Sequence, residues 1–491
     1  MPAGFTVVDF YYILPEIILT AGALLLLVVD VLLPKRDTDT VVFGVTIATL
    51  FATAVAVLSF AGVNITVSAG LLAIDGFATF FKTLFLLSAV MTVLMSAPYL
   101  RVEGLRAGEY YFLILCATLG MMFMASGVDL ITLFIGLETM AVSFYILAGF
   151  LKPSQRSNEA AIKYFLLGAF SLGILLYGMS LLYGVTGTTN LSGIADALAG
   201  SERTLVLSLA LILVTAGMGF KIAAVPFHMW APDVYEGAPT PVTAYLSVGS
   251  TAASFAMLLR IFIVGLPGLV ADWQTLFWIL AAVTMTVGNI AAITQTNTKR
   301  MLAYSSIAHA GYVLIGVATG TERGIAATMV YLWVYLFMQL GAFAIVSMLR
   351  RQDIVGDELK DLSGLYVRKP VAAIAMLIFM LSLGGIPPTA GFMGKVWVFG
   401  AAIEAGFVWL AVIGVVNSAI SIYYYYRVIV FMWLKEETLG SDIEIGPALA
   451  TALGIAVVGS VLFGIYPETL FDHAQIASEM FGSAVSTAVL Q

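Results

Sequence analysis

Residues 207–230 read LSLALILVTAGMGFKIAAVPFHMW, an apolar run long enough to cross a membrane but interrupted near its middle. Gly217, Gly219 and Pro226 surround a single charged residue, Lys221. Proline removes a backbone donor and clashes with the preceding helical turn, so the helix breaks here. Irregular backbone at membrane depth persists only where it is buried in protein or lines a wet cavity. The run therefore predicts a broken membrane helix that carries a lysine into a protein interior.

A second apolar run is interrupted in the same way. Residues 384–395 read GGIPPTAGFMGK and end on Lys395. Two interrupted spans in matching positions of two halves are typical of a transporter site. An internal duplication of about five helices would explain the spacing of the two runs.

The composition excludes a soluble fold. Hydrophobic residues make up 61% of the 491 residues and charged residues only 10%, whereas soluble domains are about 25% charged. Nucleic acid binding is not expected, because the sequence has no basic tract. Cys116 is the only cysteine, which excludes both a disulfide framework and a cysteine-ligated iron–sulfur cluster within this chain.

A spanning helix needs about 20 predominantly apolar residues, and about fourteen segments meet this test. We therefore expect one all-α, polytopic transmembrane domain over residues 1–491, with spans seven and twelve broken. The expected spans are 15–33, 41–63, 77–99, 110–126, 130–150, 160–183, 204–230, 242–264, 273–293, 301–320, 324–349, 370–399, 407–434 and 445–465.

The basic residues of the connections predict the orientation, because cytoplasmic loops carry an excess of Lys and Arg. The even-numbered connections and the tails carry only Arg203 and Arg323. We therefore expect both termini on the non-cytoplasmic side of the cell inner membrane. The odd-numbered connections carry Lys35, Arg36, Arg101, Arg106, Lys152, Arg156, Lys299, Arg300, Arg350, Arg351, Lys360, Arg368, Lys369 and Lys435.

Three charged residues lie well inside the spans: Glu138, Lys221 and Lys395. A charge at the bilayer centre costs at least about 2.5–3.5 kcal/mol, so such residues usually face a bundle interior and mark an ion path. Glu138 is either part of a proton relay or a structural ion-pair partner. Lys221 is its candidate partner, because a desolvated lysine releases its proton readily.

Two histidines allow both a functional and a structural interpretation. His309 lies mid-span and is either a proton shuttle or a neutral, hydrogen-bonded core residue. His228 follows Pro226 and is either a point of proton uptake or a group that satisfies the broken helix. The three histidines of the chain are scattered and predict no metal site.

Other charged and aromatic residues near the span ends are expected to be interfacial. Asp30 and Lys82 are interpreted as capping or interfacial charges, and Arg260 and Arg427 are expected to extend to an interface. Tyr423 to Tyr426 are typical of an aromatic belt.

Six segments of the sequence identify a family. On these segments the chain resembles the N subunit of the proton-translocating NADH:quinone oxidoreductase (respiratory complex I), one of its antiporter-like membrane subunits, over nearly its whole length. The segments are Gly136–Glu138, Lys163–Ala169, Leu176–Ser180, Phe227–Pro241, Lys299–Ile307 and Gly385–Lys395.

The resemblance implies a fold and a division of the chain. The fold would have fourteen helices with two inverted five-helix repeats, formed by spans 4–8 and 9–13. The corresponding parts are residues 1–109 (three helices), 110–267 (first repeat), 268–436 (second repeat) and 437–491 (last helix and tail).

The resemblance also implies roles for the intramembrane residues. Glu138 and Lys221 would form an ion pair that controls proton release, Lys395 would be the terminal proton-donating lysine, and His309 would be part of the polar axis between them. The sequence departs from the family at Thr251, where a lysine is usual. A hydroxyl passes a proton through water but cannot hold the charge. Either water and His309 bridge this position, or the chain pumps differently.

The leading hypothesis is a non-redox subunit of a translocase that moves protons while quinone is reduced elsewhere in the complex. FMN and iron–sulfur clusters would belong to other subunits, and this chain would hold no cofactor. Its partners would be the other membrane-arm subunits, through them the peripheral redox arm, and the lipid bilayer. The alternatives are a subunit of a multi-subunit Na+/H+ antiporter and a passive scaffold of the membrane arm.

Overall fold

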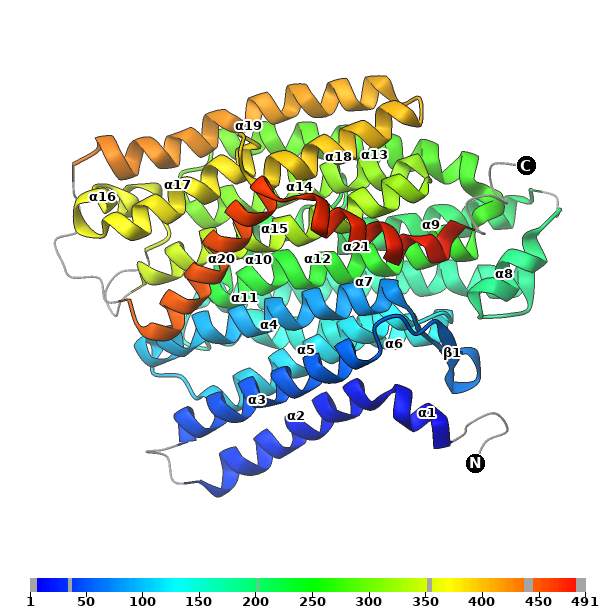
Figure 1. Ribbon diagram of the computed structural model, residues 1–491, viewed down its shortest axis with the longest axis horizontal. Helices are drawn as coiled ribbons and strands as arrows, with labels where there is room; N and C mark the ends of the chain where they lie inside the picture. The colour runs from blue at the N-terminus through cyan, green and yellow to red at the C-terminus, as the bar shows by residue number, and fades with distance from the viewer. Residues whose placement is uncertain (1–6, 34–37, 201–202, 351–355, 437–444, 483–491) are drawn as a thin grey trace.

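The computed structural model describes residues 7–33, 38–200, 203–350, 356–436 and 445–482. In this part of the chain, twelve helices are long and apolar enough to cross a membrane, and two shorter apolar helices, Leu205–Lys221 and Pro370–Gly384, stand at the expected breaks. The long helices lie side by side with similar directions (Figure 1). The fold is therefore an all-helical membrane domain whose spans follow the predicted order.

The bounds of the helices differ from the expected spans by a few residues, in either direction. The first half of the chain contributes α2 (Leu14–Leu32), α3 (Thr38–Ser59), α4 (Gly76–Glu103), α5 (Ala107–Ser126), α6 (Leu130–Ala148) and α7 (Gln155–Thr186). The second half contributes α13 (Val270–Ile293), α14 (Thr298–Thr319), α15 (Glu322–Met348), α19 (Val408–Leu434) and α20 (Pro447–Ile465).

Both broken spans are present. The seventh span consists of α9 (Leu205–Lys221) and a non-helical link, and the short α10 (Trp230–Gly237) follows it at the end of the bundle. The twelfth consists of α17 (Pro370–Gly384) and α18 (Ala390–Glu404), separated by the Ile386-Pro387-Pro388 segment. The glycines and prolines thus end the helices where the sequence predicted.

The eighth span has an irregularity that the sequence did not predict. It begins as α11 (Thr240–Tyr245), passes through a π-helical turn, η2 (Leu246–Ser250), continues as α12 (Thr251–Leu259) and ends in a second π-helical turn, η3 (Arg260–Gly265). π-Turns inside helices are rare overall. Where they occur, they often lie at functional sites. Thr251 stands directly after the first of them.

Short elements cover the end of the bundle that carries α1 (Val7–Tyr12) and α21 (Glu468–Ser478). They are the antiparallel pair β1 (Ile65–Val67) and β2 (Leu72–Ile74), with Ile65 opposite Ile74, and α8 (Leu191–Leu198). Figure 1 shows α1, β1, α8 and α21 at one end and α16 (Leu365–Arg368) at the other. The first and last described helices therefore lie at the same end of the bundle.

The connections rich in basic residues meet at the opposite end. Arg350 pairs with Glu103, and Arg156 lies 4.0 Å from Glu236 and 3.9 Å from Asp357. Residues from these connections line a shared hollow of about 390 Å³. The basic residues Lys35, Arg36 and Arg351 lie outside the described residues.

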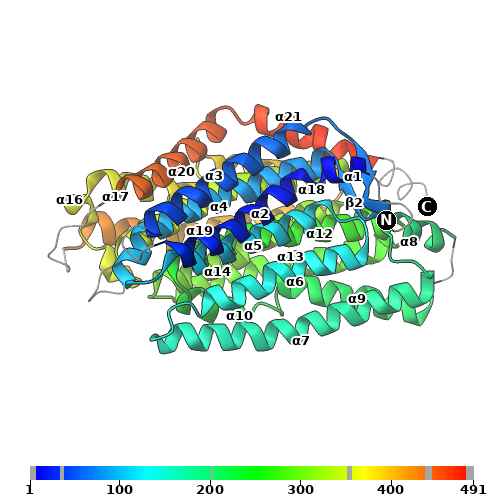
Figure 2. The same ribbon diagram turned by 90° about the horizontal axis from the view of Figure 1, so that it is seen from below.

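The most buried helices form the centre of the bundle. The eighth span, α14 and α15 each have 94% of their most apolar stretch buried, against 33% for α2 and α20. Seen from below, α7 and α9 form one margin of the molecule and α20 and α21 the other (Figure 2). Charges carried by the central helices are therefore shielded from lipid by protein.

Three expectations about interfacial residues were wrong. Arg260 does not extend to an interface, because it is fully buried and paired with Asp75. Lys82 is buried in an ion pair with Glu16, 2.7 Å away. Of the four tyrosines, Tyr424 and Tyr425 are buried and only their two neighbours face outward. These groups lie at span ends in the sequence, but their helices turn them toward partners inside the bundle.

Candidate functional site: an intramembrane row of polar groups

The two broken spans bring their lysines to the ends of half-helices. Lys221 is the last residue of α9 and is 4% exposed, and Lys395 lies in the second turn of α18 and is 3% exposed. The last carbonyls of a helix have no partner within it and carry the negative end of its dipole. Each break therefore creates a place inside the membrane where an ammonium group is stabilised.

Lys395 uses the carbonyls that the second break leaves free. Its Nζ donates to the carbonyl oxygens of Leu383 at 3.1 Å and Gly384 at 3.0 Å, the last two residues of α17. It also donates to the hydroxyl of Ser418 on α19 at 2.8 Å, and it lies 5.0 Å from the centre of the Tyr312 ring. The ammonium is thus held between the two halves of the twelfth span.

Lys221 has a different environment. Its Nζ lies 3.5 Å from the hydroxyl of Tyr145 on α6 and 5.7 Å from the centre of that ring. Glu138, two turns earlier on α6, interacts with Lys221 electrostatically. The hydrogen bond of the Lys221 ammonium goes to Tyr145. Lys221 and Glu138 therefore influence each other through their charges rather than through a shared hydrogen bond.

His309 lies at the centre of the bundle on α14. Its Nδ1 and Nε2 form hydrogen bonds with the hydroxyls of Tyr331 on α15, at 2.8 Å, and Tyr425 on α19, at 3.1 Å. Tyr425 continues the row to Ser305. The ring also packs against Tyr312, whose own ring lies beside the Lys395 ammonium. His309 and Lys395 therefore share one polar region, which agrees with their electrostatic interaction.

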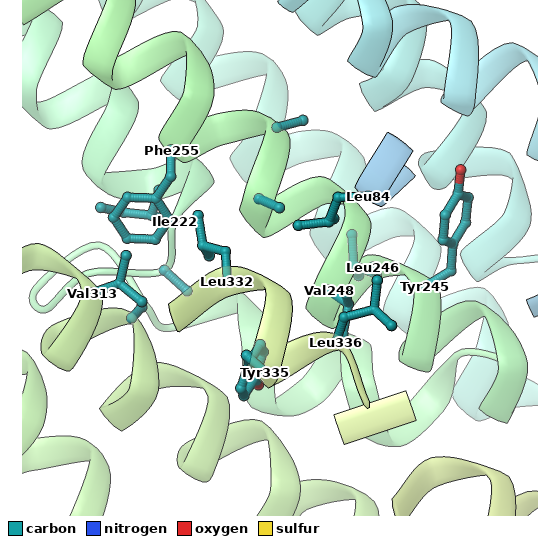
Figure 3. Close-up of a cluster of buried hydrophobic side chains, with 14 of the residues drawn as sticks. Leu84, Ile222, Tyr245, Leu246, Val248, Phe255, Val313, Leu332, Tyr335 and Leu336 are labelled. Carbon is teal, nitrogen blue, oxygen red and sulfur yellow. The ribbon is translucent and has the colours of Figure 1, made fainter. Parts of the chain in front are cut away.

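His228 stands apart from this row. It lies half-buried in the link between α9 and α10, and its Nδ1 has no hydrogen-bond partner among the described residues. Thr251 is buried at the start of α12 and faces Tyr235 of α10. Ile222, at the start of this link, lies with Phe255, Val313 and Leu332 in a cluster of buried hydrophobic side chains (Figure 3).

Sequence reasoning missed the ion-pair network that fixes α10. Asp233 accepts hydrogen bonds from Lys163 of α7 at 2.6 Å and Arg300 of α14 at 2.7 Å. Arg300 also reaches Glu236 at 3.1 Å. Burial alone would raise the pKa of Asp233, but the hydrogen bonds from Lys163 and Arg300 outweigh it and lower the pKa. All of these residues lie in the segments that carry the family resemblance, which was the available signal.

The side chains of this row are ammonium, imidazole and hydroxyl groups. In the described ranges, no group of three or more His, Cys, Asp or Glu side chains is placed to hold a metal ion. What the row offers is ammonium, imidazole and hydroxyl groups, all of which exchange protons. Such groups can donate and accept protons.

Comparison with known proteins identifies the family of the chain. Residues 126–421 match the family described as NADH:quinone oxidoreductase/Mrp antiporter, TM. The NADH-quinone oxidoreductase subunit N of Trichlorobacter lovleyi is 46% identical over 97% of this chain and 98% of its own length.

Two solved structures have the same fold. A chain of respiratory complex I from Thermus thermophilus with bound aureothin superposes with a TM-score of 0.80, at 34% identity, over 93% of this chain and 98% of that one. A chain of the Mrp complex from Dietzia sp. superposes with a TM-score of 0.83 over 99% and 100% of the two chains. Its 23% identity shows a shared fold only.

The sequence relatives are thus oxidoreductase N subunits, and the antiporter complex is similar in fold alone. The chain belongs to the family of NADH-quinone oxidoreductase N subunits, the antiporter-like membrane-arm subunits of respiratory complex I.

Proposed function

We propose that this subunit translocates protons along an intramembrane axis formed by Glu138, Lys221, His309 and Lys395, driven by quinone reduction elsewhere in the complex. The observation that carries the proposal is the pair of buried lysines at the two helix breaks, Lys221 and Lys395. A buried ammonium is costly at membrane depth and marks an ion path. Between the two lysines, His309 has both ring nitrogens on tyrosine hydroxyls.

The position of Glu138 supports the proposal that a protein partner lies beside α6. The carboxylate is half-buried, and Ile131, Ile135, Val142 and Ile146 on the same side of the helix are 58%, 56%, 48% and 52% exposed. A carboxylate that borders this surface is too costly to face hydrocarbon. A neighbouring membrane-arm subunit covers it, and a charge change in that neighbour would reach Lys221 through Glu138. Through such neighbours the chain connects to the peripheral redox arm, whose subunits hold FMN and the iron–sulfur clusters.

The proposed orientation has both termini outside the cytoplasm, in the cell inner membrane. It rests on the basic connections, which gather at the end of the bundle opposite α1 and α21. The hollow at that end would then face the cytoplasm. Its lining includes Lys299 and Asp357.

The test compares complexes that carry Lys221→Ala, Lys395→Ala or Glu138→Gln with one that carries Lys152→Ala in an exposed connection. Each complex is reconstituted into vesicles, and NADH:quinone reductase activity is measured together with proton uptake. We expect the first three variants to lower coupled turnover or protons moved per electron, and the Lys152 variant to behave as wild type. Normal pumping in a Lys221→Ala, Lys395→Ala double variant would show that the chain is a scaffold.

A further inference from the structure

Two adjoining hollows lie at the end of the bundle that carries the basic connections. One, of about 220 Å³, lies among α3, α4, α5 and α20. The other, of about 340 Å³, lies between the ends of α2, α3 and α4 and the loop that follows α4. Both are lined by Asp39, Leu100 and Arg101, so they form one surface, which we call the Arg101 hollow.

The Arg101 hollow lies at the margin of the molecule and not in its centre. α3 and α20 pack on either side of α4 (Figure 1), and only 39% and 33% of their most apolar stretches are buried. The residues that line the hollow belong to the first or last turns of their helices. Spans begin and end where the hydrocarbon of a bilayer meets its polar headgroups. The hollow therefore faces the headgroup region of one leaflet.

Part of the hollow is apolar. Phe43 of α3 packs against Tyr111 of α5 with 6.4 Å between ring centres, and Ala97 of α4 and Ala448 of α20 line the same space. Lipid tails are as apolar as these side chains, so such a crevice accepts an acyl chain by close packing and not through the hydrophobic effect. Selectivity for one lipid must therefore come from the polar part of the hollow.

Two basic and two acidic side chains form the polar part. Arg101, Arg106 and Asp39 are exposed, and the half-buried carboxylate of Asp30 lies against Gly108 in the first turn of α5. In the described ranges, none of the four charged groups forms an ion pair. Opposite charges that share a hollow without pairing remain available to a ligand that carries both signs.

The neighbouring hollow of about 390 Å³ at the same end is different, because charges that line it already have partners. Arg350 pairs with Glu103, and the Lys299 ammonium donates to the carbonyl oxygens of Glu236 and Ala238 at 2.8 and 2.6 Å. These groups need no ligand to neutralise them. The Arg101 hollow is thus the better binding site of the two.

We propose that the Arg101 hollow binds one phosphatidylethanolamine molecule of the adjoining leaflet. Its phosphate lies on the guanidinium of Arg101, whose planar donors match phosphate oxygens. Its ammonium, with three N–H donors, lies on the carboxylates of Asp39 and Asp30. The two aspartates disfavour a headgroup that carries only negative charge, and the methylated ammonium of phosphatidylcholine has no N–H to donate.

The inference is independent of proton translocation and adds a lipid ligand to the subunit. In the proposed orientation, the lipid belongs to the cytoplasmic leaflet. Its acyl chain fills the crevice between α3 and α20, so the bound molecule joins these two outer helices across α4.

The test uses the intact complex in nanodiscs that contain a photoactivatable phosphatidylethanolamine, with a diazirine high in one acyl chain. After irradiation, mass spectrometry identifies the labelled residues. We expect labelling at Phe43, Ala97 or Ala448 in the wild-type complex. Excess unlabelled phosphatidylethanolamine should suppress this labelling, whereas phosphatidylcholine and phosphatidylglycerol with the same acyl chains should not.

Four variants separate the headgroup contacts from the crevice. Arg101→Gln and Asp39→Asn should each lower labelling of the hollow about fivefold, the effect of losing one exposed charge pair. Ala448→Phe fills the crevice without changing a charge and should lower labelling as well. Lys152→Gln is the control, because it removes an exposed charge from another connection at the same end, and it should label as wild type. The amount of assembled complex, measured for each variant, distinguishes lost binding from lost assembly.

Three results would overturn the proposal. Labelling that all three phospholipids suppress equally would mean that the hollow holds an unselective boundary lipid. Suppression by phosphatidylglycerol alone would mean that the hollow selects negative charge. The absence of labelling in the hollow would mean that another subunit, or no lipid of this class, occupies it.

Discussion

The guanidinium of Arg260 donates two hydrogen bonds to the carboxylate of Asp75, at 2.9 and 2.7 Å, where both side chains are almost completely buried. Asp75 also accepts a hydrogen bond from the amide of Ala78 and so caps the start of α4. Arg260 donates a further bond to the carbonyl of Ala125 at the end of α5. One ion pair therefore fastens three spans near the end of the bundle that carries α21.

Asp75→Asn should destabilise the subunit strongly. Asparagine keeps an oxygen for the amide of Ala78, but it leaves the charge of Arg260 buried and unpaired. Breaking a buried pair in this way costs about 3–5 kcal/mol. The measurement is the amount of the chain found in assembled complex, together with the melting temperature of that complex. Adding Arg260→Met to Asp75→Asn should recover part of the lost stability. An Asp75→Asn variant as stable as wild type would contradict the expectation.

Gly385→Ala should impair proton translocation while the helices on either side remain folded. Gly385 directly follows the last residue of α17 and has a φ of 79°, a conformation that costs a non-glycine residue about 1–2 kcal/mol. A Cβ at this position would lie 2.8 Å from Cδ and 3.0 Å from Nζ of Lys395. The new methyl group would push the ammonium away from its carbonyl partners.

Gly400→Ala on α18 is the control for this exchange, since a Cβ there meets nothing within 4 Å. Both variants are compared by proton uptake per NADH oxidised in reconstituted vesicles. Uptake should fall for Gly385→Ala and stay at the wild-type value for Gly400→Ala. Equal uptake in the two would mean that the position of the Lys395 ammonium does not matter.

The Asp233 network should make stability depend on pH on the acid side. The pKa of Asp233 is lower in the folded chain than its ordinary value, because the hydrogen bonds from Lys163 and Arg300 outweigh burial. Its contribution is therefore complete above the unfolded pKa of about 3.9 and is lost as pH falls through the folded pKa. The melting temperature difference between wild type and Asp233→Asn should be constant at neutral pH and shrink below about pH 4. A melting-temperature difference that grows as the pH falls would contradict this prediction.

Tyr331→Phe should weaken the central network around His309. The exchange leaves the imidazole Nδ1 without its 2.8 Å partner, and an unsatisfied buried polar group costs about 1–3 kcal/mol. Translocation should fall with stability, because the orientation of the ring is no longer fixed from both sides. Tyr245→Phe, which also loses one buried hydrogen bond, should lower stability alone. The two effects are separated by measuring the melting temperature and proton uptake on the same preparation.

The spans and their breaks could be predicted from the sequence because their causes are local. Apolar length defines a span, and Pro226 and the Pro387-Pro388 pair end helices whatever surrounds them. Lys221 and Lys395 could also be recognised locally, because each is a single charged residue in an apolar run. The structure places both at the ends of half-helices.

The buried ion pairs could not be predicted from the sequence, because they depend on which way each helix faces in the folded bundle. Arg260 looked like a residue that extends to the interface, but its partner Asp75 is 185 positions away in the sequence. Lys82 on α4 and Glu16 on α2 likewise lie far apart in the sequence and meet only in the folded bundle.

The position of Glu138 on an outward face has a consequence for the life of the subunit before assembly. A newly inserted copy without its neighbours would expose part of a carboxylate to lipid, and a charge at the bilayer centre costs at least about 2.5–3.5 kcal/mol. That cost disappears once a neighbouring subunit covers α6. The residue proposed to sense charge in the working enzyme would thus also distinguish an unassembled copy from one that its proposed neighbour covers.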